Sequence, residues 1–278
     1  MTAETTGPPE RDQTEPASLD TSVAHPARVY DYWLGGKDNF AADREAAEAA
    51  IADNPFIVPG VRTNREFLGR AVRHLTGEAG IRQFLDIGTG IPTADNTHEV
   101  AQAAAPEARI VYVDNDPIVL VHARELLTSS ADGATDYIEA DVRDPGQVLR
   151  QAAATLDFGQ PVALMLLAIL QFIGDAEDPY ALVATLVDAV VPGSYLVISH
   201  PASDVFAEAM ANMARSLNRR QRQPDHVRFR ARDEVARFFD GLDLVEPGVV
   251  QPHRWRPGPG SFVPAHDVSA WCAVARKP

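Results

Sequence analysis

Short apolar runs alternate with stretches of helical periodicity from Ile81 onward. The apolar runs, which are rich in the Val, Ile, Leu and Phe that favour β-strands, lie at 82–88, 109–114, 135–140, 161–169 and 194–199. The helical stretches between them lie at 93–105, 116–130, 145–156 and 178–190. The run PVALMLLAI is apolar at almost every position, as expected of a strand buried on both faces of a parallel sheet. The alternation predicts βαβ units in an α/β, doubly wound sheet with helices on both faces.

The two ends of the chain depart from this alternation. Residues 233–241 have helical spacing, and two successive strands are expected at 242–250 and 267–276. Because a Pro/Gly-rich loop joins these strands, they predict an antiparallel hairpin at the sheet edge. Before Ile81 we expect three helical pieces, around 26–40 and over 42–53 and 61–75. The sequence thus divides into a tail at 1–25 that we expect to be disordered, a helical segment at 26–80 and a sheet domain at 81–278.

Composition excludes several classes of protein. The chain has 278 residues and a net charge of −14, which argues against a nucleic-acid partner because phosphate binding needs a basic surface. The single cysteine, Cys272, excludes an internal disulfide, and His25, His74, His122 and His226 show no metal-ligand spacing with carboxylates. No apolar run is long enough to span a membrane, and the N-terminal residues do not form a signal peptide. We therefore expect a cytoplasmic protein with neither a metal nor a membrane partner.

The segment FLDIGTGIPT lies at a predicted strand-to-helix turn, where open α/β sheets bind ligands. Gly88, Thr89 and Gly90 form a turn in which the glycines let a ligand approach the main chain. A dinucleotide-binding loop would carry a third glycine where Thr93 stands, and it would not place Asp86 just before the turn. A carboxylate here repels a diphosphate and attracts an ammonium group, which disfavours an NAD-dependent dehydrogenase.

Two more carboxylates follow the next two predicted strands. Asp114 lies 24 residues beyond Gly90, where a carboxylate can accept two hydrogen bonds from a ribose diol. Asp141, beside the backbone N–H of Val142, can accept a hydrogen bond from the amino group of an adenine. Either aspartate could instead cap the following helix. A ligand that carries an amine, a ribose and an adenine but no phosphate is S-adenosylmethionine, and Asn115 and Ala168 join its expected contacts.

These stretches resemble a bacterial family of class I S-adenosylmethionine-dependent methyltransferases that was long catalogued as a domain of unknown function. The resemblance extends over 26–275 and is carried by PARVYDYWLGGKDNFAADREAAE, NREFLGRAVRHL, IRQFLDIGTGIPTADNTHEVAQ, ARIVYVDNDPIVLVHAR, PVALMLLAILQFI, PGSYLVISH and FFDGLDLVEPGVV. It implies a seven-stranded, mostly parallel sheet with an antiparallel last strand. It also implies that Asp86, Gly88 and Gly90 border the methionine, that Asp114 takes the ribose, and that Asp141 and Val142 take the adenine.

The resemblance implies in-line transfer of a methyl group to an unidentified acceptor, which we expect to be a small molecule. If the acceptor is a hydroxyl or an amine, a nearby base would help, and the candidates are His200, Tyr32 and, less plausibly, His98. His200 also fits an ordinary hydrogen-bonded histidine at a strand end. The family usually has a histidine where this chain has Gln171, which could orient a substrate but cannot take a proton. A non-catalytic sensor or scaffold, which would lack an acceptor pocket, is the alternative.

The segment PARVYDYWLGGKDNF, at 26–40, predicts a lid over the cofactor. Lys37, after the tight turn at Gly36, could pair with the methionine carboxylate, and Tyr32 or Tyr30 could flank the sulfonium. Arg28 offers a further cation, which we assign to the substrate. Alternatively, the aromatic residues fix an N-terminal helix to the core.

An arginine-rich stretch lies between Arg215 and Arg232. Arg220 and Arg222 within it are expected to form a cationic rim for an anionic substrate. The alternative is a solvated helix end, because runs of charge are usually exposed.

Overall fold

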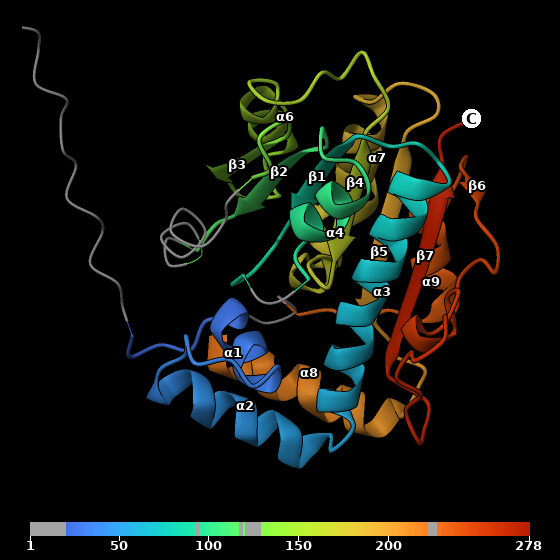
Figure 1. The fold of residues 1–278 in the computed structure, drawn as a ribbon. Helices are drawn as coiled ribbons and strands as arrows, with labels where there is room; N and C mark the ends of the chain where they lie inside the picture. The colour runs from blue at the N-terminus through green and yellow to red at the C-terminus, as the bar shows by residue number, and fades with distance from the viewer. Residues whose placement is uncertain (1–20, 93–94, 117–118, 120–128, 222–226) are drawn as a thin grey trace, which may run out of the picture.

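A seven-stranded sheet forms the centre of the molecule (Figure 1). The computed structural model describes residues 21–92, 95–116, 119, 129–221 and 227–278. Its strands are β1 (Gln83–Ile87), β2 (Arg109–Asp114), β3 (Ala134–Glu139), β4 (Ala163–Leu167), β5 (Tyr195–Pro201), β6 (Asp243–Leu244) and β7 (Ala270–Arg276). Their order across the sheet is β3-β2-β1-β4-β5-β7-β6. The first five strands pair in parallel, β7 is antiparallel to β5 and β6 is antiparallel to β7, so the predicted sheet and its terminal hairpin are confirmed.

The sixth strand is shorter than the sequence predicts. Of the expected strand at 242–250, only Asp243–Leu244 pairs as a strand, and Val250 rejoins the sheet through an isolated bridge to Cys272. Between them stand Pro247, which has no backbone N–H, and Gly248, whose φ of +78° turns the chain. Apolar composition favoured a strand here, but these two residues interrupt it.

Helices cover both faces of the sheet. The helices are α1 (Pro26–Trp33), α2 (Ala41–Asp53), α3 (Ile57–Gly77), α4 (Thr97–Ala104), α6 (Pro145–Ala152), α7 (Pro179–Asp188), α8 (Ala207–Gln221) and α9 (Arg232–Ala236). Single 3₁₀ turns are η1 (Leu170–Phe172), η2 (Asp175–Glu177), η3 (Arg237–Phe239) and η4 (Pro252–Arg254). Most of the helix predicted at 116–130, like most of the predicted tail, lies outside the described residues. None of the described helices is long and apolar enough to cross a membrane.

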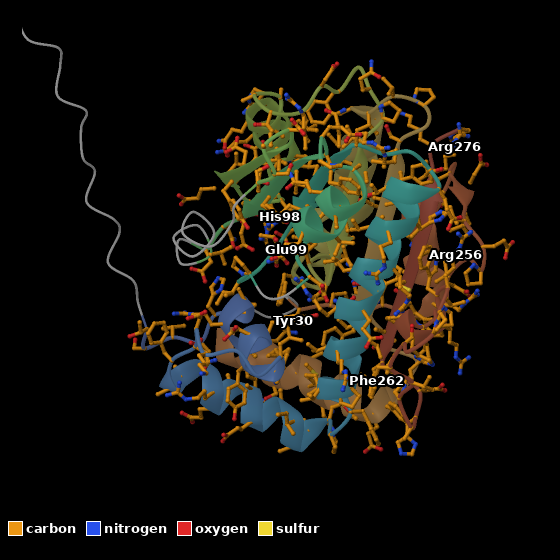
Figure 2. All side chains as sticks on the ribbon, in the orientation of Figure 1. Tyr30, His98, Glu99, Arg256, Phe262 and Arg276 are labelled. Atoms are coloured by element: carbon orange, nitrogen blue, oxygen red, sulfur yellow. The ribbon has the colours of Figure 1, made fainter. Side chains whose placement is uncertain are left out.

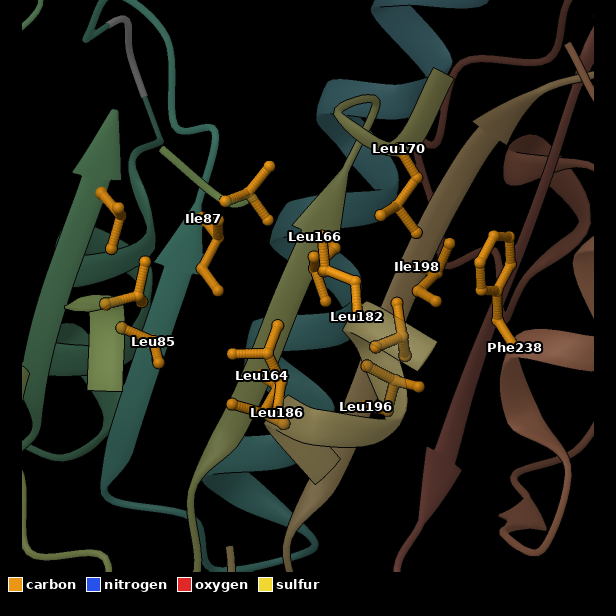
Figure 3. Close-up of a cluster of buried hydrophobic side chains, with 14 of the residues drawn as sticks. Leu85, Ile87, Leu164, Leu166, Leu170, Leu182, Leu186, Leu196, Ile198 and Phe238 are labelled. Atoms are coloured by element: carbon orange, nitrogen blue, oxygen red, sulfur yellow. The ribbon is translucent and has the colours of Figure 1, made fainter. Parts of the chain in front are cut away.

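Alternating side chains of the parallel strands supply two apolar layers. In β1, Phe84 packs with α3 and α4 on one face, whereas Leu85 and Ile87 pack on the other face with α6, α7 and η3. Figure 3 shows this second layer, in which Leu85 and Ile87 lie near Leu164 and Leu166 of β4. Because β1 and β4 are buried on both faces, they fix the position of the loops at their carboxyl ends.

Unlike α3, helices α1 and α2 do not pack on either face but lie at the carboxyl end of the parallel strands. Helices α1, α2 and α8 lie together below the sheet in Figure 1, and α2 packs against both α1 and α8. Proline at the first turn of α1 and the His25 side chain, which accepts a hydrogen bond from the Ala27 N–H, begin this layer. The layer faces the loops that follow β1, β2, β4 and β5, and it encloses a cavity against them.

Candidate functional site

A cavity of about 1200 Å³ lies between the carboxyl ends of the parallel strands and helices α1, α3 and α8. This volume exceeds the roughly 300–1,000 Å³ that is usual for a single small-molecule site. Its lining changes in character along its length. Carboxylates from the ends of β1 and β2 and from the loop after β3 lie in one part, and Met, Phe, Leu and Val side chains lie in the other.

The glycine turn after β1 brings the main chain to the cavity wall. Gly88 has φ of +74°, and a Cβ atom placed there would lie 2.6 Å from the Ile169 side chain. Gly90 has φ of +67°, and a Cβ atom there would have no other atom within 4 Å. The Gly88 N–H donates to the Val113 carbonyl at 2.8 Å, which fixes the turn against β2. The first glycine is thus required by packing, and the second leaves space for a ligand.

Asp86 is a buried carboxylate on the wall of the same cavity. Its side chain is 4% exposed, and the Thr97 hydroxyl donates to its Oδ2 at 2.7 Å. The pKa of Asp86 is raised to about 6, mainly by burial and to a smaller extent by the nearby Asp114, against the lowering effects of Thr97 and the Arg65 guanidinium. A ligand ammonium group would relieve the cost of this buried charge.

Asp114 and Asp141 lie farther along the wall. Asp114 Oδ2 accepts a hydrogen bond from the Gly90 N–H at 2.8 Å, and its Oδ1 accepts one from the Asp116 N–H at 3.0 Å. Burial is the main cause that raises the pKa of Asp114. Asp141 is more exposed, and its Oδ1 accepts a hydrogen bond from the Arg143 N–H at 2.9 Å. Asn115 donates to its other oxygen at 3.4 Å, so the three predicted positions share one wall.

This donor and acceptor set fits S-adenosylmethionine. Asp86 suits the amine, Asp114 a diol, and Asp141 with the neighbouring Val142 an adenine edge, as the sequence predicted. The cation that the structure places near Asp86 is Arg65 of α3, which donates to Asn96 Oδ1 at 2.8 Å and lines the cavity. Arg65 therefore suits the carboxylate of the methionine moiety. Arg65 could not be predicted from the sequence, because nothing in the spacing of α3 relates it to the glycine turn.

The structure does not bring Arg28, Tyr32, Gly36 or Lys37 to the cavity lining. Arg28 is buried beside Asp43, with its Nε 3.4 Å from Asp43 Oδ1, and the Tyr32 hydroxyl donates to Glu48 Oε1 at 3.1 Å. The helical phase of α1 is the reason. Arg28 and Tyr32 share one side of the helix, and the cavity side carries Tyr30 and Trp33 instead.

Tyr30 lies between the N-terminal helices and the sheet, as Figure 2 shows. Its hydroxyl accepts a hydrogen bond from Asn64 Nδ2 at 2.9 Å. Figure 2 also places His98 on α4, where its Nδ1 lies 2.9 Å from the Tyr112 hydroxyl. His98 is not part of the cavity lining.

The loop after β4 places Ala168 and Gln171 on the cavity wall. Ala168 adopts a φ of +53°, an uncommon conformation for a residue with a Cβ atom that often marks functional sites. Gln171 donates from Nε2 to the Ala168 carbonyl at 2.6 Å, across η1. The side chain of Gln171 is therefore held in place at the wall.

His200, at the end of β5, lines the cavity with both ring nitrogens engaged. Its Nδ1 lies 2.9 Å from the Pro201 carbonyl, and its Nε2 lies 3.1 Å from Arg230 Nη1. Burial lowers the pKa of His200 to about 3, and the Arg230 charge lowers it as well. The imidazole is thus neutral, donating to Pro201 and accepting from Arg230. This geometry favours an ordinary hydrogen-bonded histidine at the end of a strand over a role of His200 as general base.

The arginine-rich stretch is described only in part. Arg222 and the side chain of Arg220 lie outside the described residues. Arg228 and Arg230 both pair with Asp175, at 3.0 and 2.8 Å. The pairing partner lies on η2, more than fifty residues away in the chain, so no local pattern could predict this contact.

Across the described residues, no group of three or more His, Cys, Asp or Glu side chains is placed to hold a metal ion.

The strand order, with carboxylates on β1, at the end of β2 and in the loop after β3, matches the fold of class I methyltransferases. The model of the S-adenosyl methyltransferase family matches residues 12–278, and the chain belongs to this family. The protein is therefore an S-adenosylmethionine-dependent methyltransferase, and S-adenosylmethionine is its cofactor.

Solved structures agree with this assignment. A DUF574 family protein from Streptomyces avermitilis is 46% identical, with a TM-score of 0.89 over 93% of this chain and 99% of that chain. A protein assigned as a methyltransferase from Thermobifida fusca is 40% identical, with a TM-score of 0.84 over 95% of this chain and 99% of that chain. The plantazolicin methyltransferase BpumL, solved with a desmethyl plantazolicin analogue and SAH, is 12% identical over 90% of this chain and 95% of its own, and its TM-score of 0.54 shows a shared fold alone. No curated protein matches the chain.

Proposed function

We propose that the enzyme methylates a small molecule held in the apolar part of the cavity that also receives the cofactor. The observation that carries this proposal is the continuity of the cavity. One lining includes the carboxylates Asp86, Asp114 and Asp141 together with Met210 and Met213 of α8. The excess of volume over a single-ligand site supports two ligands in contact, as methyl transfer requires.

Cofactor binding is assigned to residues of the carboxylate part. Asp86 would hold the amine, Arg65 the carboxylate, Asp114 the ribose, and Asp141 with Val142 the adenine. S-adenosylmethionine, when bound, supplies a methyl group activated by its sulfonium, which an acceptor takes in line with the sulfur. The turn at Gly88, Thr89 and Gly90 lets the ligand approach the main chain, as the torsion angles of the glycines allow.

The chain's own contribution is positioning and the exclusion of water. Holding two reactants in a reactive geometry can contribute about 7–11 kcal/mol to the lowering of a barrier. Helices α1 and α2 would act as the lid over both ligands, with Tyr30 and Trp33 on its inner side, whereas α3 of the predicted 26–80 segment packs on the sheet. His25 Nδ1 lies 2.8 Å from Asp116 Oδ2 and joins the start of this segment to the loop after β2. Gln171 would orient the acceptor, since an amide cannot take its proton.

The alternative, a non-catalytic sensor, predicts a site with no room for an acceptor. The apolar extension of the cavity beyond the carboxylates favours the enzyme.

Two measurements test the proposal. Calorimetry with S-adenosylmethionine, S-adenosylhomocysteine and NAD should show binding of the first two ligands and none of NAD. Incubation with methyl-labelled cofactor and small-molecule extracts should then yield a labelled small molecule. Cofactor binding without label transfer to any small molecule would instead favour the sensor.

A further inference from the structure

The part of the cavity away from the carboxylates is built from apolar side chains of four separate segments. Met210 and Met213 of α8 pack with Phe172 of η1, Val61 of α3 and Phe229 in one cluster. All five side chains line the cavity. Methionine side chains adapt to the shape of a bound group and make favourable contacts with aromatic rings. This compartment therefore suits an apolar body, and an aromatic ring in particular.

Among the described residues, four segments of the compartment wall contribute no charged side chain, although Arg65 of α3 and Glu45 of α2 do line the cavity. Neither α8, η1, the segment 227–229 nor the end of β5 contributes an Asp, Glu, Lys or Arg side chain to the lining. Arg228 and Arg230, which flank Phe229 in the chain, are engaged elsewhere. Arg228 pairs with Asp175 at 3.0 Å and with Glu234 at 2.8 Å, and Arg230 is fully buried behind His200. The cations on the described lining are Arg65, which is assigned above to the cofactor carboxylate, and Arg143, which pairs with Asp141 and Glu177, so a charged acceptor would lose its hydration here without an uncommitted counter-ion.

Two buried amide oxygens on the lining have no hydrogen-bond partner in the structure, Gln171 Oε1 and Asn64 Oδ1. Gln171 is 7% exposed and Asn64 is 9% exposed. Their nitrogens are already committed, because Gln171 Nε2 donates to the Ala168 carbonyl and Asn64 Nδ2 donates to the Tyr30 hydroxyl. The bond of Gln171 fixes which of its amide atoms is the oxygen, because the Ala168 carbonyl can only accept, and an amide oxygen only accepts. A buried acceptor left without a donor is costly, so each oxygen favours a ligand that brings one.

We propose that the methyl acceptor is an uncharged, largely apolar molecule that carries a hydroxyl or N–H group, and that the amide oxygen of Gln171 receives this donor. This inference rests on the proposed function, because it assumes that the second compartment is the acceptor site. It excludes a carboxylate or phosphate acceptor, since an anion would face amide oxygens instead of donors. The rival outcome is the anionic acceptor that the sequence predicted from Arg220 and Arg222.

Three probes that share one ring system test the proposal. 2-Naphthol carries a donor, 2-methoxynaphthalene carries none, and 2-naphthoate carries a negative charge. Each is titrated into the full chain in saturating S-adenosylhomocysteine and followed by calorimetry. We expect 2-naphthol to bind at least tenfold more tightly than either of the other two probes. Equal binding of 2-naphthol and 2-methoxynaphthalene, or tighter binding of 2-naphthoate, overturns the proposal.

Variants show whether the amide oxygen of Gln171 accepts the hydrogen bond from the ligand. Gln171→Met keeps an unbranched side chain of similar length without the amide, and should abolish the preference for 2-naphthol over 2-methoxynaphthalene. Gln160→Met, at an exposed turn far from the lining, should keep the full preference. If Gln171→Met does not fold, Asn64→Leu is measured in its place and should reduce the same preference. An unchanged preference in the folded variant overturns the assignment of the donor to that amide.

The two proposals fail in different ways. If S-adenosylhomocysteine does not bind, the proposed function fails before any probe is added. If S-adenosylhomocysteine binds and the probes do not follow the expected order, the enzyme assignment stands and the acceptor class is wrong.

Discussion

The substitution Asp86→Asn should stabilise the ligand-free protein, and it should also weaken cofactor binding. The carboxyl of Asp86 has its pKa raised by burial from 3.8 to about 6, and this difference corresponds to about 3 kcal/mol in the free energy of unfolding at neutral pH. Asparagine has no charge to bury and can still accept the hydrogen bond from Thr97. The expected gain at pH 7 is therefore up to about 3 kcal/mol.

The stability difference between Asp86→Asn and the wild type should depend on pH. The native state holds the Asp86 proton more tightly than the unfolded chain, so the free energy of unfolding falls as pH rises from 3.8 towards 6. The advantage of Asp86→Asn should accordingly be near zero at pH 4 and largest at pH 7. Urea unfolding at these two pH values measures the difference, and Asp188→Asn, at an exposed end of α7, is the control that should show no such change.

Cofactor affinity should change in the opposite direction. Loss of a charged hydrogen bond weakens binding by about 1.5–3 kcal/mol, measurable by calorimetry with S-adenosylmethionine. In the wild type, the affinity should fall as pH drops below about 6, because a proton then competes with the cofactor amine for Asp86. The variant should lose this pH dependence. Equal stability of the two proteins at pH 7, or equal affinity, would refute the reasoning that links burial of Asp86 to function.

Four further predictions concern the same cavity. Asp114→Ala should weaken S-adenosylmethionine binding by about 1.5–3 kcal/mol in calorimetry, and unchanged affinity in the folded variant would contradict the ribose assignment. Arg65→Met should weaken the cofactor by a similar amount but leave adenosine binding unchanged, since adenosine lacks the carboxylate. Gly88→Ala should lower the melting temperature, because a Cβ atom would lie 2.6 Å from the Ile169 side chain at a φ of +74°. Removal of residues 1–40 should leave a folded core with much weaker cofactor binding, whereas removal of 1–24 should have no effect; equal affinity in both would argue against the lid.

The sequence predicted the sheet and the position of the carboxylates because both depend on local pattern. Asp86 and Asp114 each end or nearly end an apolar strand, and parallel strands bring their carboxyl ends to one edge. The side of a helix on which a given residue lies is harder to predict than the presence of the helix. The sequence left Tyr30 and Tyr32 as alternatives beside the sulfonium, and the helical phase of α1 puts Tyr30, not Tyr32, on the cavity side.

Other features of the site depend on contacts between distant segments. Asn64 belongs to α3, and its amide acquires significance only because Tyr30 of α1 occupies its nitrogen. The pairing of Arg230 with Asp175 likewise joins residues 55 positions apart. No periodicity or spacing in the chain relates these residues, so the apolar compartment and its two amide oxygens emerge only from the fold.

Both parts of the cavity contain polar groups that are costly to bury without a ligand. In the part proposed for the cofactor this group is the carboxylate of Asp86, and in the part proposed for the acceptor it is the amide oxygen of Gln171. A ligand that satisfies such a group binds the native state alone, and it therefore stabilises the fold as well as occupying the site. Because the unfavourable groups face different ligands, each ligand should raise the melting temperature separately. The acceptor should raise the melting temperature further even when the cofactor site is already saturated, since the proposed cofactor contacts do not include a hydrogen bond to Gln171.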